Sequence, residues 1–499
     1  YYRDLQTHPL DMKPSEADLN IRAAEEATAE RRSALMKAGA APQDLAASSE
    51  LEQHHARRAD LVKANGGMAF GFVEMLNEMD ASYEFIDNEG PTFFILTDLD
   101  APRGRIIAIN VNHPEREHWK ELVPLQPWTL QGASRVGPRL VLSYLKDACS
   151  SVRVHDLDGT FAYEVKLPGV GSAGGFRTDR EQTDTFYSYT SYTQPPTLYA
   201  LDILTGTSSV FRESKVAFDP SQFVSELIFA TAKDGTEIPL FVSRRKDVAL
   251  DGQAPCILYG YGGFGISLTP GFSPVTTQWL KMGGIYAVAC IRGGGEYGEE
   301  WHQAAVKTKH PVAFDDFIAA GEHLVAQKYT SPARLAIRGG SNGGLLVGAC
   351  LIKRPDLFGA AIPEVGVMDM LRFHLFTIGW AWKSDYGSSE NKDEFEVLNS
   401  YSPSHQLLRG KAGTLYPPTL VTTADHDDRV VPGHSFKFAA ALQASAPNGH
   451  MDPSRPYLIR VETSAGHGAG KPTKKSIDAN TDVLAFLARV FNMQPSADH

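Results

Sequence analysis

The sequence predicts two domains, a partial β-propeller over residues 1–218 and an α/β domain with a doubly wound, mostly parallel sheet over residues 219–499. Three observations lead to this prediction. Alternating, aromatic-rich runs recur at a constant period up to about residue 215. Short apolar runs then alternate with helical segments. Within that second part, a Gly-x-Ser-x-Gly turn at 339–343 connects an apolar run to a good helix.

The chain begins with a stretch that fits neither pattern. Tyr1–Leu5 resembles the tail of a strand entered in mid-course, and the absence of an initial methionine suggests that the true N-terminus is missing. Residues 15–65 are rich in Ala, Glu and Arg, which predicts two exposed helices forming an insertion. A solvated, partly disordered segment is as good an interpretation of this stretch as a partner-binding role.

From about residue 71 to 215, three strand-like runs are each followed by a polar turn and a second run. The first runs are 93–97, 140–144 and 186–190. The second runs begin at Ile106, Val152 and Leu198, a spacing of 46 residues each time. This period is typical of propeller blades with four strands each. A β-sandwich is the alternative, but the constant period favours a propeller.

A boundary between the domains is expected near Phe218-Asp219-Pro220. Beyond it, apolar runs predict the strands of a parallel sheet, with helices such as 314–327 between them and a closing helix at 481–491. The candidate strands are 256–259, 285–289, 335–337, 359–362, 419–422 and 457–463.

The turn Gly339-Gly340-Ser341-Asn342-Gly343-Gly344 fits the nucleophile elbow, a sharp strand-to-helix turn that exposes one hydroxyl at the edge of a sheet. Small neighbours let strand and helix approach each other, and the strained serine stays accessible. The helix N-terminus behind it suits a developing oxyanion. A glycine-rich turn with a capping serine is the alternative.

A serine nucleophile needs a histidine base and an acid that orients the base, in the order Ser, Asp, His in the α/β-hydrolase fold. The strand at 419–422 leads into Asp425, Asp427 and Asp428, where the acid is expected. The next strand is followed by His467, which lies between two glycines and suits a base that must turn toward Ser341. The residues alone do not separate the three acids, since two could cap the next helix or pair with Arg429.

The composition limits the classes of partner that the chain can bind. With 42% hydrophobic residues and no apolar run near the roughly 18 residues needed to span a bilayer, the chain predicts a soluble protein with no membrane partner. The net charge of −11 argues against nucleic acid. Four widely spaced cysteines form neither a disulfide framework nor a metal pattern, which favours buried thiols and a cytoplasmic location.

Six motifs together resemble those of the prolyl oligopeptidase family of serine peptidases, over most of residues 81–491. They are GGSNGG at 339–344, DHDDRVVP at 425–432, AGHGAGKP at 465–472, YGYGGF at 259–264, RGGGEYG at 292–298 and WAWKSDYG at 380–387. The resemblance implies an α/β-hydrolase domain capped by a seven-bladed propeller that admits only short peptides. It also implies acyl-enzyme chemistry without metal or cofactor.

The resemblance assigns roles residue by residue. The family acid stands two residues before a substrate-binding arginine, which selects Asp427 and makes Arg429 the partner of a peptide carbonyl. Tyr261 and the backbone N–H of Asn342 match the oxyanion hole. Trp382 matches the indole that stacks on the substrate proline. The rest of the implied pocket is Phe264, Tyr386, Val367, Ile378 and Val430.

Two departures from the family pattern are expected. The N-terminal segment and the first blades are absent, which leaves about four blades, and the insertion at 15–65 is foreign. An incomplete ring predicts a poorly soluble or self-associating chain that admits larger substrates.

The predicted function is therefore a serine endopeptidase that cleaves oligopeptides after proline. Its nearest rival is a peptide macrocyclase of the same family, in which an amine takes the acyl group. A truncated, catalytically silent interaction protein is the alternative from another class. Cleavage after Arg or Lys is disfavoured because the implied pocket is apolar.

Overall fold

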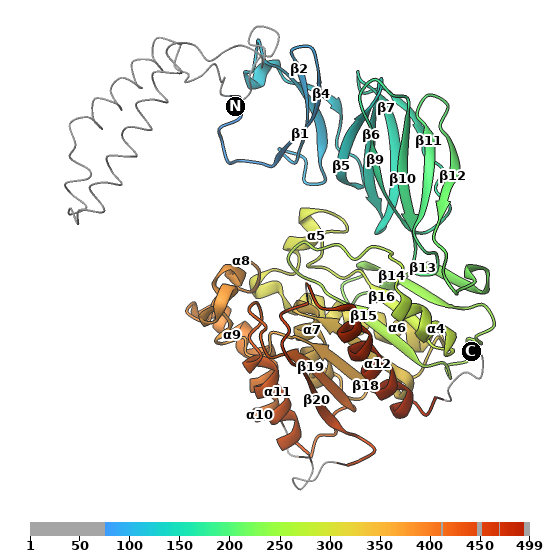
Figure 1. Ribbon diagram of the computed structural model, residues 1–499. Coiled ribbons are helices and arrows are strands. Elements are labelled where there is room, and N and C mark those ends of the chain that lie inside the picture. The colour runs from blue at the N-terminus through green and yellow to red at the C-terminus, as the bar shows by residue number, and fades with distance from the viewer. Residues whose placement is uncertain (1–74, 411–412, 447–451, 469, 494–499) are drawn as a thin grey trace, which may run out of the picture. The chain divides into compact units, whose positions relative to one another are not determined.

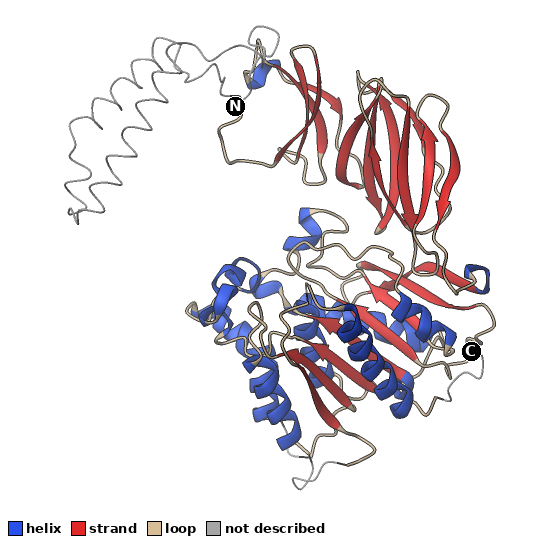
Figure 2. Ribbon diagram, viewed as in Figure 1, coloured by secondary structure: helices blue, strands red, loops and turns tan. Residues whose placement is uncertain are grey.

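The structure is a computed structural model that describes residues 75–410, 413–446, 452–468 and 470–493. Its helices and strands are labelled in Figure 1 and coloured by type in Figure 2. Of the described residues, 75–82, 89–93 and 109–119 form one compact unit and the others a second. The helical insertion predicted at 15–65 and the strand tail at Tyr1–Leu5 lie outside the described residues.

The described residues of the N-terminal part form three four-stranded sheets, with strand orders β1-β2-β3-β4, β5-β6-β7-β8 and β12-β11-β10-β9. The strands are β1 (Tyr83–Glu89), β2 (Thr92–Thr97), β3 (Arg105–Asn110), β4 (Lys120–Val123), β5 (Thr129–Val136), β6 (Arg139–Lys146), β7 (Cys149–Asp156), β8 (Phe161–Glu164), β9 (Ser172–Arg177), β10 (Asp184–Thr190), β11 (Thr197–Asp202) and β12 (Thr207–Glu213). The predicted pairs of runs are β2 with β3, β6 with β7 and β10 with β11, so the blade repeat is confirmed. The number of about four blades stays a prediction because residues 1–74 are not described.

Period-two alternation explains why these segments form packed sheets. In β6, Leu140, Leu142 and Tyr144 belong to a core shared with the first sheet, where they meet Phe94 and Ile106. The intervening Val141 belongs to a different core, which it shares with Phe176 and Tyr187 of the third sheet. Successive side chains of a strand point to opposite faces, so the middle sheet is buried on both sides, as in stacked blades.

The boundary predicted at 218–220 falls in the segment between the last four-stranded sheet and the eight-stranded sheet. Strand β12 ends at Glu213 and β13 begins at Phe223. Between them, a short 3₁₀ turn starts at Pro220, and the Asp219 carboxylate caps it by accepting a hydrogen bond from Ser221 N at 3.0 Å. A proline in the first turn and an aspartate before it are the residues such a start favours.

The C-terminal domain is built on one eight-stranded sheet in the order β13-β14-β16-β15-β17-β18-β19-β20. Its strands are β13 (Phe223–Thr231), β14 (Glu237–Arg245), β15 (Cys256–Gly260), β16 (Ile285–Ala289), β17 (Leu335–Gly340), β18 (Ala360–Glu364), β19 (Thr419–Ala424) and β20 (Tyr457–Glu462). The six strands from β15 to β20 pair in parallel, as predicted, and β13 and β14 add an antiparallel hairpin at one edge that the sequence analysis did not predict.

Helices cover both faces of this sheet. The α-helices of this domain, among the described residues, are α4 (Pro274–Lys281), α5 (Glu299–Gln303), α6 (Pro311–Ala326), α7 (Asn342–Lys353), α8 (Lys383–Tyr386), α9 (Lys392–Tyr401), α10 (Pro403–Arg409), α11 (Gly433–Ala444) and α12 (Thr473–Val490). Neighbouring strand residues separate into two cores: Ile337 packs with α6 and α7, whereas Ala336 packs with α4 and α12. A sheet buried on both faces needs near-continuous apolar strands, which is the pattern the sequence carries.

The helix predicted at 314–327 is α6. The closing helix predicted at 481–491 is the second half of α12, which begins at Thr473, in a polar first turn with little apolar signal. The buried residues Val483, Phe486 and Leu487 follow helical spacing and face the sheet. Within the described ranges, no helix is both long and apolar enough to cross a bilayer.

Candidate active site

The predicted functional residues follow the carboxyl ends of neighbouring parallel strands. Tyr261 comes directly after β15, Ser341 after β17, Asp427 after β19 and His467 after β20. Parallel strands end at the same edge of a sheet, and this edge is where open α/β sheets carry their sites. The sheet topology therefore brings these residues to one rim.

Ser341 lies at the turn from β17 into α7 with a φ of 59° and a ψ of −116°, outside the regions that a residue with a side chain ordinarily adopts. Its backbone is fixed from both sides. Ser341 N donates to Glu364 O at 2.8 Å, and Ser341 O accepts from Gly344 N at 2.9 Å. The strain is held by these bonds, which leaves the side chain at the sheet edge.

Glycines are required in the elbow because other backbone atoms approach their Cα atoms closely. A Cβ on Gly339 would lie 2.4 Å from Gly343 O, and one on Gly343 would lie 2.6 Å from Gly260 O. A Cβ on Gly344 would lie 2.5 Å from Glu364 O. Any larger residue at these positions would push α7 away from β15 or β18 and move Ser341 with it.

Asp427 and His467 form a hydrogen-bonded pair. Asp427 Oδ2 is 2.7 Å from His467 Nδ1, and the carboxylate is fully buried. The other oxygen, Oδ1, accepts from Arg429 N at 3.0 Å and Val430 N at 2.8 Å. Of the three acids that the sequence left open, Asp427 is therefore the one that contacts the histidine. Its carboxylate is oriented by two backbone donors as well.

Asp425 holds the loop that carries His467. Its Oδ1 accepts a long hydrogen bond from Ala465 N at 3.4 Å, and Asp425 N donates to Glu462 O at 3.0 Å. The same carboxylate pairs with exposed His426 at 2.7 Å. The bond to His426, followed by backbone donors of the loop, lowers the pKa of Asp425 to about 2. Asp428 is exposed.

Tyr261 and Asn342 meet beside the serine. Burial raises the pKa of Tyr261, and a hydrogen bond with Ser341 acts in the opposite direction. The Asn342 side chain is buried and joins two elements, since its Nδ2 donates to Tyr261 O and its Oδ1 accepts from Tyr386 OH at 2.7 Å. Asn342 therefore fixes the backbone of Tyr261 relative to the first turn of α7.

Aromatic rings gather next to this rim. Phe264 meets Tyr386 edge-on at 5.3 Å between centroids, and Trp382 stacks on Phe373 at 6.4 Å with 14° between the planes. Phe264 has a φ of 58°, and its N–H donates to the buried Asp385 at 3.2 Å. Phe373, which the sequence analysis did not single out, is fully buried and supports both Trp382 and Tyr386.

The remaining predicted pocket residues divide into two groups. Val367 and Val430 are each 1% exposed and belong to the same core as Tyr386. Ile378 is 47% exposed and is not part of that core. Arg429 is exposed and forms no ion pair among the described residues. Its charge is close enough to Tyr261 to oppose, in part, the rise in the pKa of that phenol that burial causes.

A second histidine–aspartate pair lies beside the aromatic cluster and was missed by the sequence analysis. His302 Nε2 is 2.7 Å from Asp385 Oδ2, the oxygen that also accepts from Phe264 N. His302 Nδ1 is 3.4 Å from Glu299 Oε2. The hydrogen bond to Asp385 is the main cause of a raised pKa at His302. Asp385 lies in the quoted motif at 380–387, but nothing local pointed to His302.

The fold and this rim define an α/β-hydrolase domain preceded by propeller blades. Two family models match the chain: the prolyl oligopeptidase family over residues 270–494, and the N-terminal β-propeller domain of prolyl oligopeptidase over residues 40–214. The chain belongs to the prolyl oligopeptidase family.

Individual relatives agree. A prolyl endopeptidase of Elizabethkingia meningoseptica is 46% identical over 416 residues, which cover 83% of this chain and 58% of the relative. A solved prolyl endopeptidase is 44% identical with a TM-score of 0.78, covering 84% of this chain and 61% of that one. Prolyl oligopeptidase B from Galerina marginata, bound to a 35mer hydrolysis and macrocyclization substrate, is 37% identical with a TM-score of 0.78, over 84% and 58% of the two chains. The chain thus spans about three fifths of the relatives it matches.

Proposed function

We propose that this chain carries the catalytic domain of a serine endopeptidase that hydrolyses peptides on the carboxyl side of proline. The observation that carries the proposal is the Asp427–His467 hydrogen bond at 2.7 Å, on the same sheet edge as Ser341 in its strained elbow. A nucleophile on a tight turn and a histidine oriented by a buried acid are the parts that acyl transfer requires.

In the proposed reaction, Ser341 Oγ attacks the carbonyl carbon of the substrate proline and its proton passes to His467 Nε2. The bond to Asp427 keeps a proton on Nδ1, so the lone pair is on Nε2. The imidazolium then protonates the leaving amine, and water hydrolyses the acyl-enzyme by the reverse sequence. Among the described residues, Ser341 and His467 share no hydrogen bond, and such bonds often tighten only when substrate is bound.

Two donors would stabilise the negative charge on the carbonyl oxygen, the phenol of Tyr261 and the backbone N–H of Asn342. The Asn342 side chain ties the Tyr261 backbone to α7, so the two segments that carry these donors are held together before reaction. Donors that need no reorganisation stabilise the transition state most. Arg429 is the proposed partner of a substrate carbonyl.

The proposed specificity for proline rests on a flat apolar slot. Trp382 offers the stacking face, and Phe264, Tyr386, Val367 and Val430 surround it. We place Ile378 at its exposed rim. The proposed substrates are proline-containing oligopeptides. A cytoplasmic location is proposed because the four cysteines are free thiols, three of them buried.

The test compares blocked Gly-Pro, Gly-Ala and Gly-Arg reporter substrates, together with labelling by a fluorophosphonate, which reacts only with an activated serine. We expect stoichiometric labelling of wild type, none of Ser341→Ala, and the highest kcat/KM for Gly-Pro. Labelling without cleavage of any reporter would contradict the assigned specificity. A chain that is not labelled would contradict the peptidase and leave the silent interaction protein.

Macrocyclisation is a second candidate, because the Galerina relative was solved with a substrate for both reactions. The Ser341 acyl-enzyme is common to both outcomes, and only the acceptor differs. Mass spectrometry of a linear precursor decides: cyclisation removes one water from the joined segment, whereas hydrolysis adds one.

A further inference from the structure

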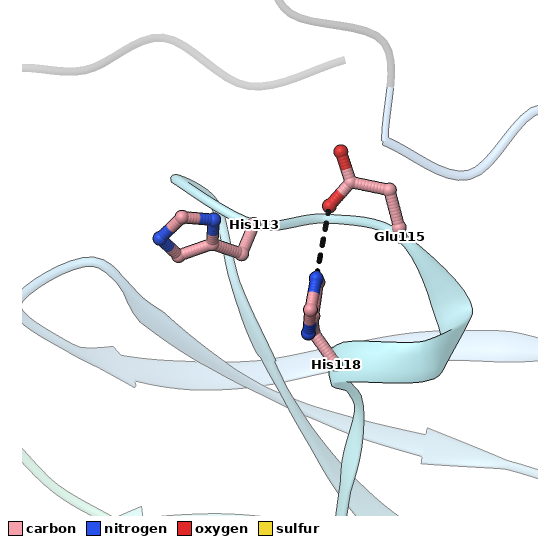
Figure 3. A group of neighbouring side chains, drawn as sticks. All are labelled: His113, Glu115 and His118. Carbon is pink, nitrogen blue, oxygen red and sulfur yellow. Dashed lines mark ion pairs between the residues drawn. The ribbon is translucent and has the colours of Figure 1, made fainter.

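The loop between β3 and β4 holds three metal-ligating side chains close together. One ligand atom from each of His113, Glu115 and His118 lies within 4.8 Å of the others, and all three residues are exposed. Figure 3 shows the His118 ring pointing toward the Glu115 carboxylate, with His113 on the same side of the loop. The proposed peptidase reaction uses none of these three side chains.

Local bonds fix the backbone that presents these side chains. His113 N donates to Asn110 O at 2.9 Å, and the two residues form an isolated bridge. His118 N donates to Glu115 O at 2.9 Å, which closes a 3₁₀ turn, and Trp119 Nε1 donates to Pro114 O at 2.8 Å across it. The turn brings residues 113, 115 and 118 to one side, so the ligand set is largely formed in advance.

The neighbouring charges favour a cation. Glu117 lies 3.9 Å from His118, in addition to Glu115 at 4.0 Å. The one basic residue within the turn, Arg116, is held by Glu78 and Asp80 and lies over the Trp119 ring at 5.4 Å. Its charge is therefore balanced by two carboxylates of its own.

The present ion pair does not account for the arrangement. At 4.0 Å, His118 Nε2 and Glu115 Oε2 are too far apart to share a hydrogen bond. Ligands about 2.0–2.1 Å from a tetrahedral zinc lie roughly 3.4 Å from one another, so rotations of exposed side chains suffice to reach that geometry. Two imidazoles and one carboxylate suit zinc and copper rather than the oxygen-preferring magnesium and calcium.

We propose that His113, Glu115 and His118 form a Zn²⁺ site with three protein ligands and a fourth position open to water. All three ligands come from one six-residue segment, so the ion cross-links the β3–β4 loop. Binding to the folded state alone raises its stability with metal concentration.

The test titrates the whole chain with Zn²⁺ by calorimetry and with Co²⁺ by visible absorption. Because the chain has 16 histidines, the decisive quantity is the difference between wild type and variants. His113→Gln and His118→Gln should each lose one equivalent of tight binding, or weaken it by at least about 10-fold. Glu115→Gln should weaken it without removing an imidazole. Glu117→Gln is the matched control and should leave the stoichiometry unchanged.

All four side chains are exposed, so unfolding midpoints in the presence of a chelator should agree among the variants. Added Zn²⁺ should raise the midpoint of wild type and of Glu117→Gln, but not of His118→Gln. The proposal is overturned if wild type and His118→Gln bind the same number of ions with the same affinity. It is equally overturned if Glu117→Gln loses as much binding as His118→Gln.

Discussion

The His467–Asp427 and His302–Asp385 pairs have the same length, 2.7 Å, yet differ in what the second ring nitrogen meets. His302 has a carboxylate at both nitrogens, from Asp385 and Glu299, so its protonated form, which donates from both nitrogens, is favoured. His467 uses only Nδ1 among the described residues, which leaves Nε2 for a proton. The comparison shows that a histidine paired with an acid is a candidate base only when its second ring nitrogen is free to accept a proton.

The largest expected effect comes from breaking the His467 pair. Ser341→Ala and His467→Ala should each lower kcat by about 10⁴-fold or more, and the double variant should lose little further, because nucleophile and base act as one unit. Steady-state kinetics on a Gly-Pro reporter measure all three. Losses that multiply in the double variant would show that the two residues act separately.

The acid should matter almost as much. Asp427→Asn removes the charge that orients His467, and we expect a fall in kcat of roughly 10⁴-fold. Asp425→Asn is the matched control, because that carboxylate holds the loop backbone and not the ring. A variant of Asp425 with the greater loss would reverse the assignment of the acid.

The roles of Asp425 and Asp427 could not be distinguished from the residues alone. Local patterns predicted the elbow and the six parallel strands, because glycines and apolar runs encode turns and strands directly. The order Ser, Asp, His could be read along the chain in the same way. Asp425 and Asp427 are two residues apart on one loop, and only the folded loop decides which faces His467. The sequence resemblance selected Asp427, and the residues alone did not.

Longer separations were less predictable still. His302 and Asp385 are 83 residues apart, and their meeting depends on how α5 and α8 are placed around the sheet. In the sequence, Phe373 cannot be told from any other core aromatic residue, and only the structure shows that its ring stacks on Trp382. The β13–β14 hairpin was missed, although Leu240, Phe241 and Val242 of β14 form an apolar run like those that predict the parallel strands.

A moderate effect on specificity is expected from the two sides of the aromatic pocket. Trp382→Ala removes the stacking face and should lower the preference for Pro over Ala by about 1–3 kcal/mol. His302→Gln should lower it less, by loosening the Asp385 carboxylate that fixes Phe264 N. Fluorophosphonate labelling should persist in both. An unchanged Pro/Ala ratio of kcat/KM in Trp382→Ala would remove the indole from the pocket, and lost labelling in His302→Gln would place that residue in the chemistry.

The smallest expected effect is on stability, and it follows from the charge on His302. Since its folded-state pKa is raised above the ordinary value near 6.5, the folded state binds the proton more tightly than the unfolded state. The resulting stabilisation is complete below about pH 6.5 and is lost as the pH rises through the raised folded-state pKa. We expect less than about 1 kcal/mol, because the His302 side chain is partly exposed and water screens its charge. Urea unfolding midpoints of wild type and His302→Gln should therefore converge toward pH 9 and separate toward pH 6. If His302→Gln ran parallel to wild type over this range, the pKa of His302 would not be raised on folding, and the contrast with His467 would fail.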